Sequence, residues 1–422
     1  MTDVIDGGFK GVPPGAPPFT LAELPGRNWH ALRELSPPFA LLKRRALDGN
    51  RAFLRRLLAA TGALYAPHGK TTMSPELFRL QLDDGAWGIT LATPMQVAIA
   101  RRFGVARILL ANEVTDPHGL RFLAEELRRD AGFELWAYVD SEASVRLWRE
   151  ALSEAPRPLP VLLEVGFAAG RAGCRSLDQA LAVARAVQRA PALRLRGVAG
   201  FEGILHRDSA AAEDAAVAEF VAQIAAVARG LDEAGLFAPG DVVLSAGGSA
   251  FYDLVTTGLQ GARLSRPHRV LLRSGCALVH DDGAYAHAFA RVAARWPAVA
   301  SLGPAPQPAL ELWGTVLSRP EPGRVVAGLG KRDVSHDGAL PRPLLWFRPG
   351  EHEAPRAVAW PLRTAALNDQ HALLDTAPET PLRPGDLVGF GISHPCLTFD
   401  RWRLLFVVDD AYRVVGGVRT FF

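Results

Sequence analysis

Short apolar runs alternate with longer amphipathic segments along the middle of the chain. Eight of these runs have the length and the apolar content of buried strands: residues 63–69, 87–93, 107–114, 134–140, 160–166, 195–203, 241–249 and 270–279. The segments between them carry apolar residues at helical spacing. In the first of these segments, Ser74 is the predicted N-cap and Pro75 the first helical residue.

Strands that alternate with helices are typical of a parallel sheet, and eight such units predict an α/β fold, a (β/α)8 TIM barrel. An open doubly wound sheet is the alternative. The barrel is favoured because the strands number eight and because no Gly-rich dinucleotide-binding turn follows the first strand.

The pattern changes near residue 300. Residues 309–330 predict two strands joined at Pro-Glu-Pro-Gly, and residues 404–422 predict another hairpin. The proline-rich stretch before the barrel cannot form a long helix. We therefore predict three parts, which are an N-terminal arm (1–36) that packs on the β domain, a barrel (37–297) and a C-terminal β-rich domain (298–422).

Composition and charge exclude several functional classes. The chain has 422 residues and a net charge of +3, and its 47 Lys and Arg are scattered among 44 Asp and Glu, which is no footprint of nucleic-acid binding. The first residues lack the regions of a signal peptide, and no apolar stretch reaches the roughly 18 residues of a membrane span. With only three cysteines, far apart, we expect a reduced cytoplasmic protein without a membrane partner.

Lys70 ends the first predicted strand, in the stretch ALYAPHGK. The chain contains only three other lysines: Lys10, Lys43 and Lys331. A lysine ammonium can lose its proton and attack a carbonyl, whereas a guanidinium effectively cannot. Because barrel active sites lie at the C-terminal ends of the strands, Lys70 is a candidate nucleophile, with a plain surface lysine as the alternative.

Two stretches rich in small residues end the seventh and eighth strands, SAGGS (245–249) and RSGC (273–276). Backbone N–H groups of small residues can approach an anion closely, and barrels commonly bind phosphate at this position. SAGGS could otherwise be a simple tight turn. A lysine beside a phosphate site predicts pyridoxal phosphate, whose aldehyde needs an amine and whose phosphate needs an anchor.

These motifs also resemble a known family, the D-serine dehydratases and D-threonine aldolases, within the pyridoxal phosphate enzymes built like alanine racemase. PHGK (67–70) matches the family's Pro-His-x-Lys motif, and VGFAAGRAG (165–173) is similar to its Gly-x-Gly-Arg-x-Gly segment. SAGGS resembles its phosphate loop, and SHPC (393–396) resembles its metal-binding His-x-Cys. The resemblance extends over nearly the whole chain.

The resemblance implies roles for individual residues. Lys70 would form the Schiff base, and His68 would orient the lysine or the cofactor, although a core histidine is an equal alternative. The implied cofactor-binding residues are Arg171, Phe201, Gly247, Gly248, Ser249, Arg273, Ser274 and Gly275. Phe201 and Ala277 stand where the family has hydroxyl-bearing aromatic residues, so the substrate preference is open.

A metal site is implied as well. His394 and Cys396 would bind a divalent metal, with zinc favoured because imidazole and thiolate form a borderline-soft ligand pair. On an extended segment the two side chains would point the same way. Cys174 and Cys276 are expected to be packing residues.

The implied activity is that of a dehydratase and deaminase of 3-hydroxy D-amino acids, D-serine being the simplest, which gives a 2-keto acid and ammonia. The metal would stabilise the leaving hydroxide, and Lys70 would take the α-proton. One alternative is retro-aldol cleavage of the D-threonine aldolase type, giving glycine and an aldehyde. Another is a non-catalytic pyridoxal phosphate-binding protein, against which the β domain argues. A racemase is disfavoured because no opposite-face tyrosine is evident, and the resemblance implies a homodimer.

Overall fold

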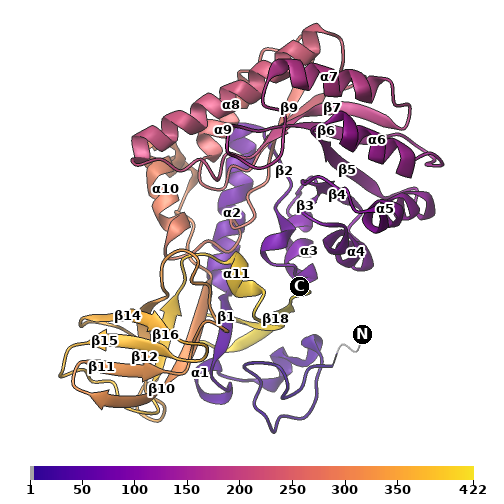
Figure 1. Ribbon diagram of the computed structural model, residues 1–422. Helices are drawn as coiled ribbons and strands as arrows, with labels where there is room; N and C mark the ends of the chain where they lie inside the picture. Colours follow the sequence, from indigo (N-terminus) through magenta and orange to yellow (C-terminus); the bar gives the residue numbers. More distant parts are fainter. Residues whose placement is uncertain (1–3) are drawn as a thin grey trace.

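The computed structural model describes residues 4–422 and contains two domains and an N-terminal arm (Figure 1). The larger domain holds a parallel sheet of eight strands in the order β2-β9-β8-β7-β6-β5-β4-β3. Its strands are β2 (Leu64–Tyr65), β3 (Ile89–Leu91), β4 (Arg107–Leu110), β5 (Glu134–Val139), β6 (Leu159–Val165), β7 (Leu193–Gly200), β8 (Val242–Ala246) and β9 (His268–Leu272). All eight predicted strands are thus confirmed.

Helices follow these strands and cover the outside of the sheet (Figure 1). They are α2 (Arg44–Thr61), η3 (Gly69–Thr71), α3 (Pro75–Asp83), α4 (Pro94–Arg102), α5 (Pro117–Arg129), α6 (Glu142–Ala151), α7 (Leu177–Gln188), α8 (Ala210–Glu233), α9 (Tyr252–Gln260), α10 (Ala284–Arg295) and η4 (Pro297–Leu302). Ser74 is the N-cap of α3 as predicted, but its hydroxyl donates to Glu76 rather than capping the helix.

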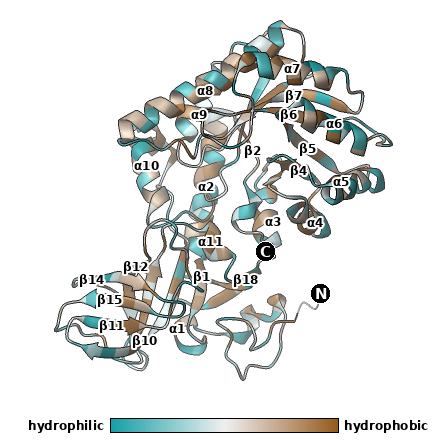
Figure 2. Cartoon of the chain, in the orientation of Figure 1, coloured by the Kyte–Doolittle hydropathy of each residue, from teal (hydrophilic) through white to brown (hydrophobic). Residues whose placement is uncertain are grey.

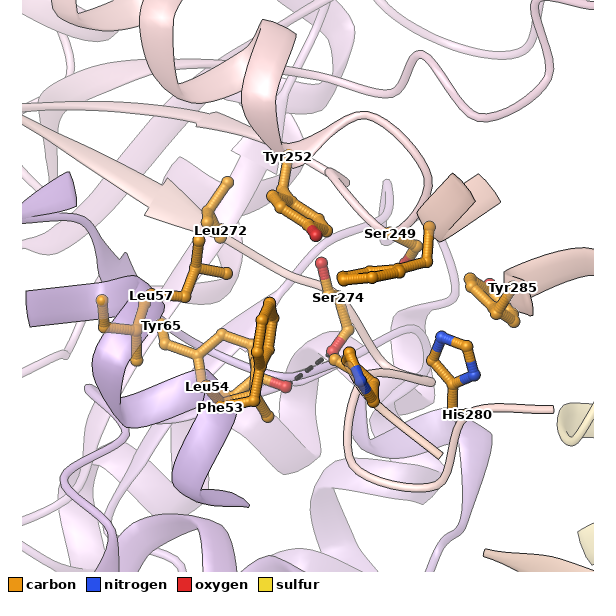
Figure 3. A pocket seen from close by; sticks show the side chains of 14 residues that line it. Phe53, Leu54, Leu57, Tyr65, Ser249, Tyr252, Leu272, Ser274, His280 and Tyr285 are labelled. Atoms are coloured by element: carbon orange, nitrogen blue, oxygen red, sulfur yellow. Dashed lines mark hydrogen bonds between the residues drawn. The ribbon is translucent and has the colours of Figure 1, made fainter. Parts of the chain in front are cut away.

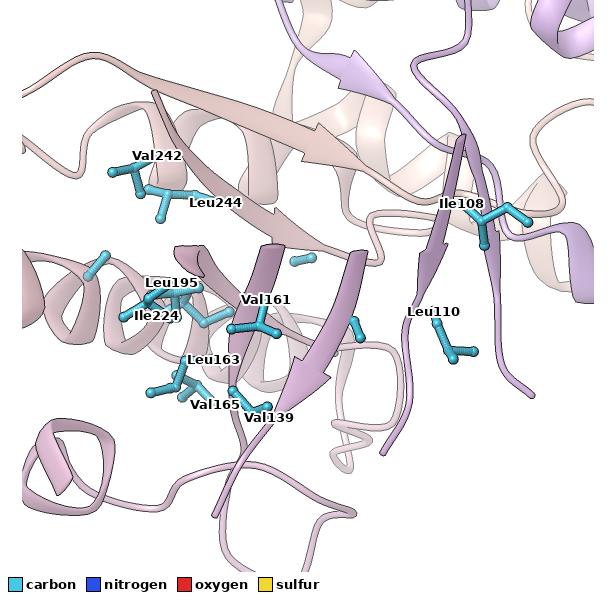
Figure 4. Packing of buried hydrophobic residues seen from close by; sticks show 14 of the residues in the cluster. Ile108, Leu110, Val139, Val161, Leu163, Val165, Leu195, Ile224, Val242 and Leu244 are labelled. Atoms are coloured by element: carbon cyan, nitrogen blue, oxygen red, sulfur yellow. The ribbon is translucent and has the colours of Figure 1, made fainter. Parts of the chain in front are cut away.

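The parallel sheet curls until its two edge strands meet. The join is a single parallel bridge between His68 and Thr90, supported by the hydrogen bond from Trp87 N to Tyr65 O, 2.7 Å. Successive side chains of a strand point to opposite faces. Leu109 and Leu162 therefore belong to the interior cluster, whereas their neighbours, such as Ile108 and Leu163, pack under the helices (Figure 4). The barrel interior is packed, so chemistry is confined to its mouth.

The second domain is a mixed, mainly antiparallel sheet in the order β13-β12-β16-β10-β1-β17-β18, to which β11, β15 and β14 add. Its elements are β1 (Phe39–Lys43), β10 (Leu310–Glu321), β11 (Arg324–Ala327), β12 (Arg342–Phe347), β13 (Arg356–Ala357), β14 (Leu362–Leu367), β15 (Ala372–Thr376), β16 (Leu387–Gly391), α11 (Cys396–Phe399), β17 (Leu404–Val408) and β18 (Val414–Arg419). Both predicted hairpins are present.

The strand β1 comes before the barrel in the sequence but belongs to the sheet of the C-terminal domain. We expected the barrel to begin at residue 37, but residues 39–43 lie between β10 and β17 in the second domain's sheet. This strand is short, apolar and buried on both faces, so its sequence resembles that of a barrel strand. The chain enters the barrel only afterwards, along α2.

The N-terminal arm covers one face of the second sheet. It contains the short helices η1 (Leu21–Glu23), η2 (Pro25–Arg27) and α1 (Ala31–Glu34). Ile5 and Phe19 of the arm share a buried cluster with Phe39, Trp313 and Phe406 of the sheet. In both domains the apolar residues are concentrated on the strands and on the helix faces that pack against them (Figure 2). Across residues 4–422, no helix combines the length and the apolarity needed to cross a bilayer.

Candidate active site

Lys70 lies in η3, the short turn that follows the first barrel strand. Gly69 allows this turn to pack closely, because a Cβ atom there would lie 2.7 Å from Ile89 Cγ2. Lys10 and Lys43 form ion pairs with Asp333 and Glu311. The Lys70 side chain is exposed and has no hydrogen-bond or ion-pair partner within residues 4–422. Its amine is therefore available for chemistry at the barrel mouth.

His68 lies two residues before Lys70 and is surrounded by cations. Burial, followed by the positive charges of Lys70, Arg273 and Arg171, holds its pKa well below the usual value. Its Nδ1 atom is buried without a hydrogen-bond partner. The imidazole is thus neutral at neutral pH, and the residues that exert these charges meet around it.

The stretches SAGGS and RSGC form one connected surface beside the lysine turn. Arg273 N donates to Gly247 O at 3.2 Å, and Ser274 Oγ donates to the same carbonyl at 3.4 Å. Gly248 has φ +71°, a left-handed conformation that glycine adopts without strain. Gly275 packs against the lysine turn, since a Cβ atom there would lie 2.4 Å from Thr71 Oγ1.

A buried carboxylate holds the SAGGS loop. Glu202 is only 1% exposed and accepts hydrogen bonds from Gly247 N at 3.0 Å and from Gly248 N at 2.5 Å. These two N–H groups are consequently engaged by the protein itself. The N–H groups of Ser249 and Gly275, in contrast, donate to no other group in the described part of the chain.

Hydroxyl groups converge beside these free N–H groups. The Tyr252 hydroxyl, at the start of α9, is buried without a partner and points towards Ser274 (Figure 3). Ser249 and Tyr285 from α10 line the same pocket. An apolar cavity lies between β9 and helices α2 and α10, and the side chains that carry these hydroxyls form part of its lining (Figure 3). The orphaned donors fit a group that carries a phosphate.

Arg171 and Phe201 lie together beside the SAGGS loop. The Arg171 guanidinium is 4.6 Å from the centre of the Phe201 ring, and that ring also lies against Gly247. Arg273 is buried, and donates to Ser245 Oγ at 2.8 Å and to Gly200 O at 2.7 Å. The structure thus brings together the cofactor residues that the sequence predicted.

Carboxylates line the remaining wall of the mouth, with Glu113 after β4, Asp140 after β5 and Glu164 near the end of β6. Burial, with the nearby charges of Asp140 and Glu164, raises the pKa of Glu113 to about 9. Both carboxylate oxygens of Glu113 and the hydroxyl of Tyr138 are buried without partners. Burial raises the pKa of Glu164, and the positive charge of Arg273 is the strongest influence in the opposite direction. This wall gives the mouth a polarity that a cationic or hydrogen-bonding ring could use.

The predicted metal pair lies at the start of α11. His394 Nδ1 is 2.7 Å from Asp337 Oδ2, and the other side of the imidazole bonds Cys396. This bond to Cys396, with Asp337, raises the pKa of His394 to about 9. Hydrogen bonds from Cys276 and then from His394 lower the pKa of Cys396 to about 4.

The donor set suits a metal ion, because an imidazole oriented by an outer carboxylate and a thiolate are common zinc ligands. The predicted extended conformation is wrong, since Pro395 has helical dihedral angles (φ −65°, ψ −38°) and is the N-cap of α11. The fixed φ of proline favours this position. His394 and Cys396 nevertheless converge, because the turn of the chain brings them to one side.

The lysine turn and the metal pair meet across the domain boundary. Cys396 Sγ is 3.4 Å from Thr71 Oγ1, the residue directly after Lys70. These residues are 325 positions apart in the sequence. A group bound to Lys70 and a cation bound to His394 and Cys396 would therefore lie near each other at the domain boundary.

The sequence did not reveal several residues of this site. Glu202 directly follows Phe201, but only the aromatic residue was predicted to have a role. Tyr252, Tyr285 and Asp337 carry no local signal, since their positions depend on packing. Cys276 was expected to be a packing residue, but its Sγ lies 3.7 Å from Cys396 Sγ. Cys174 is buried as expected, with its thiol near Asp140 O.

Comparisons with known proteins match both domains. The model of the alanine racemase N-terminal domain matches residues 55–267, and that of a serine dehydratase domain matches residues 309–408. D-threonine aldolase from Arthrobacter sp. is 27% identical over 351 residues, 82% of this chain and 81% of that protein. 3-Hydroxy-D-aspartate aldolase from Paracoccus denitrificans (strain Pd 1222) is 26% identical over 236 residues, 56% of this chain and 59% of that protein. The match thus spans less than two thirds of the Paracoccus protein.

The fold is similar to that of solved enzymes. D-threo-3-hydroxyaspartate dehydratase from Delftia sp. HT23 superimposes with a TM-score of 0.70 at 21% identity, covering 92% of this chain and 98% of that one. A variant of such a dehydratase was solved in a metal-free form, with a TM-score of 0.69 at 20% identity and the same coverage. At these identities the likeness shows the fold, a parallel barrel followed by a β-rich domain.

Proposed function

Since the chain belongs to the alanine racemase N-terminal domain family, the fold-type III pyridoxal phosphate proteins, and ends in a serine dehydratase-type domain, we propose that it is a lyase of 3-hydroxy D-amino acids. The observation that carries the proposal is the contact between the lysine turn and the metal pair, 3.4 Å from Thr71 Oγ1 to Cys396 Sγ. The related aldolases and dehydratases act on substrates of this class by name.

Pyridoxal phosphate would be held at three points of the mouth. Lys70 Nζ would bind its aldehyde carbon. The free N–H groups of Ser249 and Gly275, with the hydroxyls of Tyr252 and Ser274, would take its phosphate. Phe201 would cover one face of the cofactor ring, and the Arg171 guanidinium lies over the Phe201 ring. The cofactor supplies an electron sink for a carbanion at the substrate's Cα.

Lys70 has the position and the freedom of a general base. Within residues 4–422 its amine has no hydrogen-bond or ion-pair partner that would compete for it. Lys70 Nζ would take the proton from the substrate's Cα as a general base. His68, neutral and half-buried at the root of the same turn, would orient the lysine.

His394 and Cys396 would hold a divalent cation, zinc by their donor atoms, with positions left open for the substrate. A cation there supplies Lewis-acid stabilisation to the oxygen on Cβ. Asp337 keeps the proton on Nδ1 of His394, so that the other ring nitrogen faces the metal position. Loss of the β-hydroxyl would give a 2-keto acid and ammonia, with D-serine as the simplest substrate.

The second candidate is cleavage between Cα and Cβ, as in a D-threonine aldolase. It is favoured by the sequence relatives, which are aldolases by name. Incubation with D-serine, D-threonine and 3-hydroxy-D-aspartate separates the two reactions. Release of ammonia with a 2-keto acid supports elimination, and release of glycine with an aldehyde supports cleavage.

The proposal as a whole is tested by Lys70→Ala. Wild-type protein given pyridoxal phosphate should absorb visible light and turn over a D-amino acid, and the variant should do neither. Lys331→Ala, on the exposed surface of the other domain, is the matched control. A variant that keeps both the absorbance and the turnover would remove the proposal. The proposal includes a homodimer, as the resemblance to the family implies, and the mass in solution measures it. It also includes a cytoplasmic location.

A further inference from the structure

Cys276 and Cys396 come from different domains and form a close thiol pair. Cys276 follows Gly275 at the end of β9, and Cys396 starts α11, 120 residues later. Their sulfur atoms are 3.7 Å apart. A disulfide has a sulfur–sulfur distance of about 2.05 Å, so the two atoms need to approach by only about 1.7 Å. Side-chain rotation over such a distance requires no rearrangement of the domains.

The two thiols differ in access. Cys276 is 2% exposed, whereas Cys396 is half-buried and lies next to the exposed Leu397. An oxidant in solvent therefore reaches the sulfur of Cys396 first. Cys276 lies directly behind it, in the position of a resolving cysteine.

A third metal ligand is the other possible role for Cys276. Within residues 4–422, however, no three His, Cys, Asp or Glu side chains converge in a way that could hold a metal ion. Tyr285 also lies close enough to Cys276 to influence its thiol. These contacts favour a thiol that is kept beside Cys396 without being required by the metal.

We propose that Cys276 and Cys396 form a reversible disulfide that prevents the metal site from being loaded. With hydrogen peroxide as oxidant, the sulfur of Cys396 attacks one oxygen, the O–O bond breaks, and the leaving hydroxide takes the proton of the Cys396 thiol to form the first water. The sulfur of Cys276 then attacks the Cys396 sulfur, the S–O bond breaks, and the thiol proton of Cys276 leaves with the hydroxyl as water. Two thiols and one peroxide give one disulfide and two waters. A dithiol reductant reverses the reaction.

The disulfide and the metal exclude each other, because Cys396 cannot serve both. This consequence rests on the proposed metal site, whereas formation of the disulfide does not. Oxidation would remove the thiolate ligand and leave His394 alone. Bound zinc would in turn shield Cys396, so the switch would act on protein that has lost its metal.

The test is made on the full chain, stripped of metal with a chelator and treated with hydrogen peroxide. We expect the intact mass to fall by about 2 Da and a proteolytic digest to contain a peptide pair linked through Cys276 and Cys396, both reversed by a dithiol. In Cys276→Ser and Cys276→Ala the linked peptides should vanish, and Cys396 should proceed to the sulfinic acid, a gain of about 32 Da. Cys174→Ser, which removes the remaining cysteine, should behave like wild type.

Wild-type protein that yields no linked peptides would overturn the proposal, whatever its activity. Loss of zinc from both Cys276 variants, measured as bound metal per chain in protein with an unchanged melting temperature, would also overturn it by making Cys276 a ligand. Preloading with zinc should slow formation of the linked peptides at least tenfold. Equal rates with and without zinc would remove the link to the metal site.

Discussion

Replacing Glu202 tests the anchor of the SAGGS loop. The Glu202 carboxylate is 1% exposed and accepts from the N–H groups of Gly247 and Gly248. Glu202→Ala leaves both N–H groups buried without an acceptor. Each such loss costs about 1–3 kcal/mol, so the variant should lose roughly 2–6 kcal/mol of unfolding free energy.

Glu202→Gln gives a graded control. The amide oxygen of glutamine can accept from one N–H group, but its NH2 would face the other as a second donor. We therefore expect an unfolding free energy between those of wild type and Glu202→Ala. Glu219→Ala, on the exposed face of α8, should change the unfolding free energy by no more than about 0.5 kcal/mol.

Denaturant unfolding and cofactor titration together measure the effect. If the loop loses its fixed shape, the dissociation constant for pyridoxal phosphate in Glu202→Ala should rise at least tenfold, or about 1.4 kcal/mol. An unfolding free energy equal to that of Glu219→Ala would show that the carboxylate does not hold the loop. Tighter cofactor binding in Glu202→Ala would show that the carboxylate competes with the phosphate, and would refute the reasoning.

Three further changes have defined outcomes. In Gly248→Ala, the left-handed φ of +71° should cost about 1–2 kcal/mol of unfolding free energy, measured by denaturant titration; no loss would mean that the loop has another conformation. Asp337→Ala should weaken zinc binding about 10–100-fold in competition with a coloured chelator, and unchanged affinity would exclude Asp337 as the outer partner of His394. Burial lowers the pKa of His280 to about 4, so the unfolded chain binds this proton from about pH 6.5 downward while the folded chain stays neutral until about pH 4. The unfolding free energy should thus decrease as the pH is lowered through this window, by about 3 kcal/mol at its acid end. His280→Asn should remove that part of the pH dependence, because asparagine tolerates the left-handed backbone at this position. Equal slopes of unfolding free energy against pH for both proteins would contradict the assignment.

The barrel could be predicted because its signals are local. Each strand is an apolar run between turn residues, and each helix has its own periodicity, so strand number and helix alternation can be counted without knowing any contact. Lys70, SAGGS and RSGC are likewise placed by their position at strand ends. The candidate cofactor residues therefore follow from the order of elements along the chain.

The sequence did not reveal the partners that lie far apart along it. The strand at residues 39–43 joins the second sheet because β10 and β17 bury it, although its sequence would also suit the barrel. The carboxylate of Glu202 found its two N–H groups 45 and 46 residues away. No periodic pattern encodes such pairings, because they depend on how finished elements pack.

The sequence by itself determined the type of domain, and it singled out the candidate lysine and the candidate ligand pair of the proposed metal site, since each depends on neighbours within a few positions. Only the tertiary structure decided that Thr71 and Cys396, 325 residues apart, lie in contact and that Cys276 stands behind Cys396. The physical reason is that a contact between domains is fixed by the burial of their joined surfaces, a property of the whole chain that no short segment contains.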